Sequence, residues 1–114
     1  MDKRFKLRAD QIERLVPPMG ACIATDRITV DGEKVGYMYR EDPDDENDSG
    51  WRFFAGDEDD AYANDPQRLA HYDVNTICNY DRSIIPHLDA EPGTAFARDA
   101  ETGELVQEEL VPPE

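Results

Sequence analysis

The sequence predicts an α+β fold, with a mainly antiparallel sheet of about five strands and several short helices. Apolar and polar side chains alternate with a period of two in residues 27–40, 50–55 and 94–99, which is typical of strands with one buried face. Residues 66–88 instead carry apolar side chains at roughly helical spacing, interrupted by capping residues. Because strands and helices do not alternate regularly, an antiparallel sheet is favoured over a parallel βαβ arrangement.

The N-terminal part of the chain predicts one short helix. Ile12, Leu15 and Val16 recur at helical spacing within residues 9–16, and Pro17 would end the helix.

A chain of 114 residues has the length of a single domain. We expect that domain to occupy residues 19–110. The helix and a linker precede it in residues 1–18, and a tail follows in residues 111–114.

The next segment predicts strands joined by a tight turn. Residues 21–25 are small and β-prone, and residues 27–40 alternate on both sides of Asp31-Gly32. An Asp-Gly pair suits the positive φ angles of a two-residue hairpin turn. We therefore expect a hairpin centred on this pair.

An acidic loop and a third strand are expected next. Residues 41–49 contain no apolar side chain, which predicts an exposed, mobile loop. Residues 50–55 predict a strand with Trp51 and Phe53 on one face and Arg52 and Phe54 on the other. We expect both faces of this strand to be at least partly covered.

Three aspartates in the second half of the chain each precede a short apolar segment, as helix N-caps do. They predict short helices at residues 66–72, 74–80 and 82–88, preceded by Asp65, Asp73 and Asp81. Residues 94–99 then alternate and residues 101–105 bring the chain back, which predicts a C-terminal hairpin.

The charge of the chain excludes several classes of partner. It carries 27 acidic and 12 basic residues, a formal net charge of −15 at pH 7, which repels nucleic acid and anionic membrane surfaces. No apolar stretch approaches the ~18 residues of a membrane span, and the first residues lack the apolar run of a secretory signal. We expect a cytoplasmic protein in which Cys22 and Cys78 are buried thiols.

The acidic runs favour a metal site as the alternative interpretation. Residues 45–50 resemble the start of an EF-hand loop, but Gly56 stands at the twelfth position, where a bidentate Glu is needed. The carboxylates of residues 57–60 could bind the metal ion of a metal-dependent hydrolase. Asp45, Asn47 and residues 57–60 would be the ligands in that alternative. Adjacent residues do not generally converge on one ion, so we assign no metal ligand and no cofactor.

No catalytic constellation stands out in the sequence. His71 and His87 are isolated, and the local sequence places no Ser or Cys beside either of them as a nucleophile. The glycines are scattered and form no phosphate-binding loop. We therefore assign no catalytic residue.

Aromatic and polar side chains indicate a binding surface instead. Trp, Tyr and Arg dominate the hot spots of protein interfaces. We favour ordinary core packing for Tyr37, Phe53 and Phe54, and we assign Trp51 and Arg52 as anchors for a partner. With steering carboxylates and a polar surface added, the predicted partner-binding residues are Trp51, Arg52, Asp57, Glu58, Asp59, Asp60, Asn75, Asn79, Tyr80 and Asp81.

A family resemblance rests on four segments, GACIATDRITVDGEKVGYMYRE, SGWRFFAGDEDDAY, YDVNTICNYDRSIIPHLD and GTAFAR. They cover about residues 19–98 and resemble a widespread family of small acidic bacterial proteins that is grouped with the immunity proteins of polymorphic toxin systems, the immunity protein thirty-three-like domain. The resemblance implies that residues 19–110 bind and neutralise a toxin, or serve as a recognition module elsewhere. It supplies no catalytic residues.

These observations together predict a non-enzymatic cytoplasmic binding protein. We expect it to bind a protein partner through an acidic and aromatic surface. By resemblance, that partner would be a toxin, and the charge of this chain favours a basic one.

Overall fold

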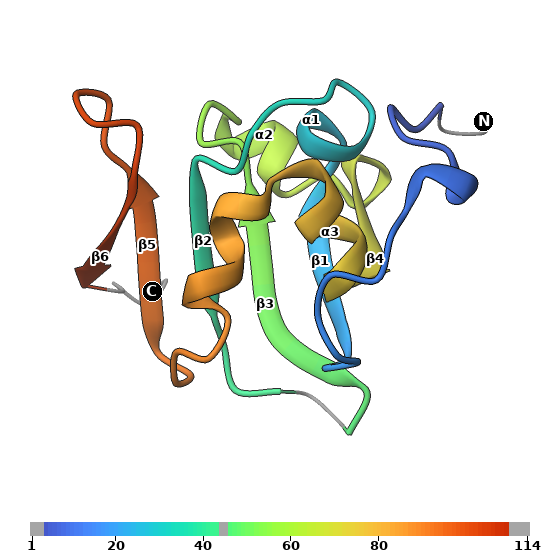
Figure 1. Cartoon of the computed structure of the whole chain (residues 1–114). Helices are drawn as coiled ribbons and strands as arrows, with labels where there is room; N and C mark the ends of the chain where they lie inside the picture. The colour runs from blue at the N-terminus through green and yellow to red at the C-terminus, as the bar shows by residue number, and fades with distance from the viewer. Residues whose placement is uncertain (1–3, 44–45, 110–114) are drawn as a thin grey trace.

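The computed structural model describes residues 4–43 and 46–109, which form a six-stranded sheet and several short helices (Figure 1). In chain order the elements are η1 (Ala9–Gln11), β1 (Ala21–Thr25), α1 (Asp26–Thr29), β2 (Tyr37–Arg40), β3 (Asp48–Phe54), α2 (Asp60–Ala63), η2 (Pro66–Arg68), β4 (Leu69–Asp73), α3 (Val74–Tyr80), η3 (Arg82–His87), β5 (Thr94–Arg98) and β6 (Leu105–Glu109). None of the helices in these residues is long and apolar enough to cross a membrane.

The strands lie in the order β4-β1-β3-β2-β5-β6. Every neighbouring pair is antiparallel except β1 and β3, which are parallel. The predicted α+β class and mainly antiparallel sheet are therefore confirmed, with one strand more than expected.

One face of the sheet, the inner face, packs against α3 and η3 and holds the core. It presents Cys22, Ala24, Met38, Trp51, Phe53 and Phe96, and the helical layer adds Val74, Ile77, Cys78, Ile84 and Leu88. The indole Nε1 of Trp51 donates a hydrogen bond to the carbonyl oxygen of Leu88 at 3.2 Å. Burying each large side chain here contributes about 2 to 3 kcal/mol.

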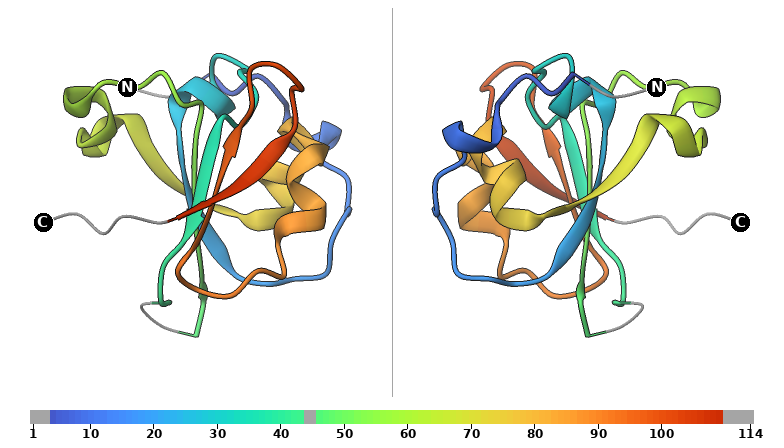
Figure 2. Two further views of the ribbon diagram at one scale, coloured as in Figure 1. Left: turned by 90° about the vertical axis from the view of Figure 1, so that its left-hand side faces the viewer. Right: turned by 90° about the vertical axis from the view of Figure 1, so that its right-hand side faces the viewer.

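The opposite face of the sheet, the outer face, has much less cover. Its side chains are Ile23, Thr25, Tyr37, Tyr39, Arg52, Phe54, Ala97 and Val106, which alternate with those of the inner face. Figure 2 shows α3 and the N-terminal segment on one side of the sheet and α2 on the other. Most side chains of the outer face are half-buried, and Val106 is 48% exposed.

The hairpin predicted around Asp31-Gly32 is wrong. Residues 26–29 form α1 instead, and β2 pairs with β3 and β5 rather than with a strand before the turn. Gly32 does take a positive φ of 80°, and its N–H donates to the carbonyl of Ile28 at 3.1 Å. The glycine therefore terminates a helix, a use that requires the same backbone conformation as a hairpin turn.

Two of the predicted helices are corrected by tertiary contacts. Residues 66–72 form only the turn η2, and the chain then enters β4, which pairs along its whole length with β1. Residues 9–16 form only the turn η1, because side chains of α3 hold the backbone that follows it.

The predicted caps are confirmed. The carboxylates of Asp65, Asp73 and Asp81 accept hydrogen bonds from the backbone N–H groups two residues later, at η2, α3 and η3. The helix at residues 74–80 has the predicted bounds, and η3 is a 3₁₀ helix that ends one residue earlier than expected.

The acidic loop is shorter than predicted, because β3 already begins at Asp48 and Ser49 is buried. Residues 41–43 and 46–47 are exposed, as expected. The C-terminal hairpin is confirmed as β5 and β6, although residues 99–104 form its turn and the return strand begins only at Leu105.

Candidate functional site

Three aromatic rings gather on the outer face and form what we call the aromatic cluster, Tyr37, Tyr39 and Phe54. Tyr37 and Tyr39 lie two residues apart on β2 and so share a face, and Phe54 pairs directly with Tyr37 across the β2–β3 ladder. The ring of Phe54 stacks on Tyr39 at a centroid distance of 5.9 Å, and Tyr37 is tilted against both other rings.

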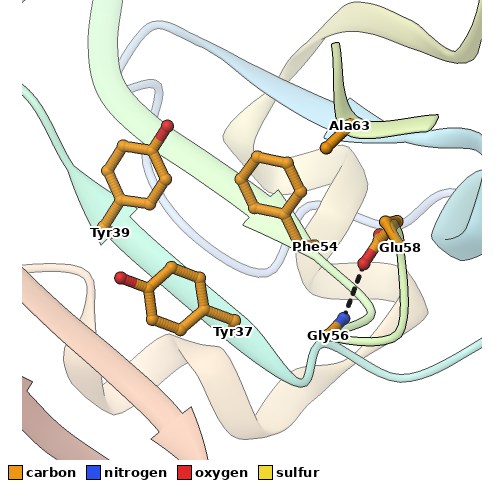
Figure 3. Close-up of a pocket in the computed structure, with 6 residues that line it drawn as sticks. All are labelled: Tyr37, Tyr39, Phe54, Gly56, Glu58 and Ala63. Carbon is orange, nitrogen blue, oxygen red and sulfur yellow. Dashed lines mark hydrogen bonds between the residues drawn. The ribbon is translucent and has the colours of Figure 1, made fainter. Parts of the chain in front are cut away.

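The aromatic cluster forms one wall of a cavity of about 260 Å³ (Figure 3). Gly56, Glu58 and Ala63 close its other side. Burial raises the pKa of both tyrosines, and the nearby carboxylates add to the shift, Glu108 for Tyr37 and Glu41 for Tyr39. Both phenols are therefore neutral at physiological pH.

Glu58 reaches the cavity from the turn between β3 and α2. Its Oε2 accepts hydrogen bonds from Thr25 Oγ1 at 2.6 Å and from the Ala55 N–H at 2.8 Å, and its Oε1 accepts one from the Gly56 N–H at 2.8 Å. Since three donors hold the carboxylate, its negative charge is fixed in position beside the rings.

Arg52 lies beside Tyr39 on the outer face but is almost fully buried. Its two Nη atoms bind the two carboxylate oxygens of Asp48 at 3.0 Å each, and its Nε binds Glu41 at 3.2 Å. The hydrogen bond to Asp48 is the main reason why the pKa of Arg52 is raised. The guanidinium is thus fully engaged within the protein, although it was predicted as an anchor for a partner.

Trp51, the other predicted anchor, lies wholly in the core on the inner face. Its ring stacks on Phe53 and tilts against Phe96, and the guanidinium of Arg40 lies 5.7 Å from its centroid. In this conformation its side chain offers no surface to a partner.

The carboxylates of Asp57, Glu58 and Asp59 do not point to one place. Asp57 pairs with Arg27, whose guanidinium lowers the pKa of that carboxyl, and Asp59 accepts a hydrogen bond from the Tyr62 N–H at 2.8 Å. Glu58 turns toward the cavity, and Asp60 is the first residue of α2.

The metal-site alternative gains no support from this arrangement. Within residues 4–43 and 46–109, no three His, Cys, Asp or Glu side chains are grouped so that they could hold a metal ion. Asp45, the first residue of the EF-hand-like segment, lies outside the described residues, and Asn47 is exposed.

Asn75 and Asn79 bind the N-terminal segment of the chain. Asn75 Oδ1 accepts from the N–H groups of Leu15 at 2.7 Å and Val16 at 3.1 Å, and its Nδ2 donates to the Glu13 carbonyl at 2.8 Å. Asn79 exchanges two further hydrogen bonds of 2.9 Å with the backbone of Glu13. The two amides hold an extended backbone against α3.

Tyr80 and Asp81 also make internal contacts. The Tyr80 hydroxyl accepts a hydrogen bond from the Leu7 N–H at 3.2 Å. Asp81 Oδ2 accepts from the Val35 N–H at 3.0 Å and from Arg98 Nη2 at 2.7 Å. The four polar residues predicted as a binding surface therefore lie on α3 or directly after it, and each one joins separate parts of the chain.

The cysteines and histidines form no apparent reactive centre. Cys22 and Cys78 are free, buried thiols whose pKa values burial raises, that of Cys78 to about 11. His87 packs on Phe96 at a centroid distance of 4.4 Å, and His71 is exposed on β4.

Sequence reasoning placed Tyr37 and Phe54 in the core and assigned no site role to Tyr39. The alternation of β2 and β3 contains the missing signal, because Tyr37 and Tyr39 face away from the buried Met38, and Phe54 faces away from Phe53. Only the arrangement of the layers shows which of the two faces is covered.

Comparison with protein families gives a match to the immunity protein Imm33 domain over residues 22–109. The matched part includes all of the sheet except the first residue of β1, together with the aromatic cluster and α3. Among the described residues it leaves out 4–21, in which Asn75 and Asn79 bind the backbone of Glu13, Leu15 and Val16. No curated protein and no solved structure matches the chain.

Proposed function

Since the chain belongs to the family of the immunity protein Imm33 domain, we propose that it neutralises a protein toxin by binding it through the outer face of the sheet. The observation that carries this assignment is an aromatic cluster on a sheet face that α2 covers only in part. Aromatic side chains around a hollow, bordered by polar groups, are typical of the centre of a protein interface. The chain acts by occupying a surface of the toxin and carries out no reaction itself.

We further propose that the toxin is basic at its contact surface. The net charge of −15 supports this, because a strongly acidic protein attracts a basic partner over long distances and speeds its association. Asp59 is exposed on the turn next to the cavity, where it adds to the attracting field, whereas Asp57 adds less because Arg27 pairs with it. Trp51, Asn75, Tyr80 and Asp81 contribute by supporting the sheet and α3.

The cytoplasm is the compartment that we propose for the complex. Cys22 and Cys78 are both free thiols in the buried core, which is typical of proteins in reducing compartments. The assignment is tested by localising a tagged chain in its source cells, and recovery of the protein outside the cytoplasm would contradict it.

A growth assay tests the proposed function. A toxin is identified as a protein that copurifies with this chain and that arrests growth when it is expressed alone in a naive host. We expect coexpression of the chain to restore growth. If the toxin binds the wild-type chain but growth stays arrested, the immunity role is contradicted.

Variants of the outer face test the location of the interface. Phe54→Lys places a charge in the aromatic cluster and is expected to abolish growth restoration. Phe5→Lys is the matched control, because Phe5 is 46% exposed and packs on Tyr72 on another part of the surface. Both variants are first checked for a native circular dichroism spectrum. A folded Phe54→Lys variant that still restores growth fully would show that the toxin binds elsewhere.

A further inference from the structure

The cavity beside the aromatic cluster has the size of a site for one side chain. Its volume of about 260 Å³ lies below the range of roughly 300 to 1,000 Å³ that is typical of pockets for drug-sized ligands. Tyr37, Tyr39 and Phe54 supply three ring surfaces on one side (Figure 3). A long unbranched side chain would place its methylene groups on these rings.

The charges around the cavity favour a cation. Tyr39 pairs with Ala95, which pairs in turn with Glu108, so Glu108 lies on the same face two strands away. Glu41 and Glu58 also lie next to the rings, and Asp48 lies beside Arg52. Two of these four carboxylates, Asp48 and Glu41, bind the guanidinium of Arg52, which is thereby bound on its three nitrogen atoms. The region keeps a negative potential.

Glu58 lines the cavity, and its carboxylate retains one acceptor position. A carboxylate offers about four lone-pair positions, and the hydrogen bonds from Thr25, Ala55 and Gly56 occupy three of them. Since two of these bonds go to Oε2, the remaining position belongs to Oε1. A cation that lies on the rings could donate one hydrogen bond there.

We propose that this cavity receives the cationic end of an arginine or lysine side chain of the toxin, with its charge on the ring faces and its hydrogen bond on Glu58 Oε1. The identity of this side chain as part of a toxin rests on the proposed function. The chemistry of the cavity does not, because Tyr and Phe rings attract guanidinium and ammonium groups through their electron-rich faces. Arg stacks on such rings more often than Lys.

A titration of the isotope-labelled protein tests the site without the toxin. The probes are N-acetyl-arginine amide, N-acetyl-lysine amide and N-acetyl-citrulline amide, a neutral analogue of the arginine probe with nearly the same shape. At constant ionic strength, we expect saturable NMR shifts at Tyr37, Tyr39 and Phe54 with the two cationic probes. Citrulline should bind roughly tenfold more weakly than arginine or not detectably.

Matched variants locate the binding. Phe54→Leu keeps an apolar side chain at the same strand position but removes the ring face, and it should weaken the arginine probe several-fold. Phe5→Leu removes an exposed ring that packs on Tyr72 and does not line the cavity, so it should leave binding unchanged. A lower dissociation constant for the arginine probe than for the lysine probe, fitted from the saturation curves, would identify arginine as the preferred residue, and the reverse would identify lysine.

Two results would overturn the proposal. One is the absence of saturable shifts with either cationic probe, and the other is equal binding of arginine and citrulline. The growth assay is independent of both measurements. If growth is not restored while the cationic probes bind, the immunity role fails and the cation site stands. If growth is restored but the probes do not bind, the cation site fails and the immunity role stands.

Discussion

Asp81 shows how one side chain can connect three parts of this chain. Its carboxylate caps η3 through the Ser83 N–H and hydroxyl, accepts a hydrogen bond from the Val35 backbone, and forms an ion pair with Arg98 on β5. The residue is only 4% exposed. Because all of these groups depend on one carboxylate, its loss leaves several polar groups without a partner.

We expect Asp81→Ala to lower the free energy of unfolding by about 2 to 3 kcal/mol, since it removes an N-cap and leaves a half-buried guanidinium without its carboxylate. Urea unfolding measures the change. Asp89→Ala is the control, because Asp89 is exposed in the loop after η3 and should change the stability by less than about 0.5 kcal/mol. Equal effects of the two variants would contradict the structural role of Asp81.

Because its two thiols are buried, we expect the folded protein to lose stability at alkaline pH. Burial raises the pKa of Cys78 to about 11 and raises that of Cys22 as well, whereas an unfolded thiol ionises near pH 8.5. Above that pH the unfolded state releases protons that the native state keeps, so stability falls by up to about 1.4 kcal/mol per pH unit for each thiol. Below about pH 8 the thiols have no effect.

Unfolding free energies measured between pH 8 and 10 test this prediction. The Cys78→Ala variant should show a smaller slope than the wild type, because one of the two thiols no longer titrates. An identical slope in both proteins would mean that Cys78 ionises equally easily in the folded and unfolded states.

At the scale of elements, α3 organises the chain around it. Its inner side packs in the core through Val74, Ile77 and Cys78, while the amides of Asn75 and Asn79 hold residues 13–16. These amides bind backbone atoms only. The N-terminal segment therefore follows an extended path although its side chains have helical spacing, because α3 satisfies its backbone hydrogen bonds.

We expect Asn75→Ala to loosen residues 13–16 while the sheet stays folded. The substitution leaves the Leu15 and Val16 N–H groups without their acceptor, so their hydrogen exchange should speed up by at least about tenfold, the equivalent of roughly 1.4 kcal/mol. Thr76→Ala, in the next position of α3, is the control. Unchanged exchange at Leu15 and Val16 would show that the amide does not hold the segment.

Two glycines allow the cost of a strained φ angle to be measured separately from the cost of a steric clash. Gly50 in β3 and Gly93 before β5 both have positive φ angles, of 86° and 94°. A Cβ atom at Gly50 would clash with the carbonyl oxygen of Glu41, whereas one at Gly93 would meet nothing within 4 Å.

Gly93→Ala should therefore cost about 1 kcal/mol from the strained φ angle alone. Gly50→Ala should cost at least about 2 kcal/mol, because the clash adds to the strain. Thermal unfolding of the two variants gives the comparison. If they are equally stable, the contact between Gly50 and Glu41 adds nothing.

At the scale of the whole molecule, the fold separates a covered face of the sheet from a more open one. The helical layer of α3 and η3 covers the inner face. The chain as a whole carries a formal net charge of −15. Such a charge steers a partner of opposite sign toward the protein but contributes less to its residence time. The proposed complex should therefore form fast at low salt.

We expect the association rate constant with the toxin to fall by about tenfold or more as salt is raised from ~50 mM to ~500 mM, with little change in the dissociation rate constant. Glu108→Gln, at the border of the outer face, should lower the association rate at low salt, whereas Asp89→Asn, in the exposed loop after η3, should lower it less. Stopped-flow mixing measures both. A rate constant that does not depend on salt would contradict electrostatic steering.

The correct predictions from sequence are those that depend on neighbouring residues. Asp73 and Asp81 cap the helices that follow them, and the alternation of residues 94–99 does form a strand. The wrong ones concern residues whose partners are distant in sequence. Asp31-Gly32 was expected to turn a hairpin, but β2 finds its neighbours in β3 and β5, so the same glycine conformation ends α1.

The candidate site shows the same difference between local and long-range properties. The amino-acid sequence alone predicts that the chain is acidic, that its strands carry aromatic side chains on both faces, and that aspartates cap its helices, because composition, alternation and capping are local properties. The packing of the layers, by contrast, places Trp51 in the core and leaves Tyr37, Tyr39 and Phe54 to line a cavity. Which face is covered depends on where α3 and η3 pack, and that results from contacts between residues far apart in the chain.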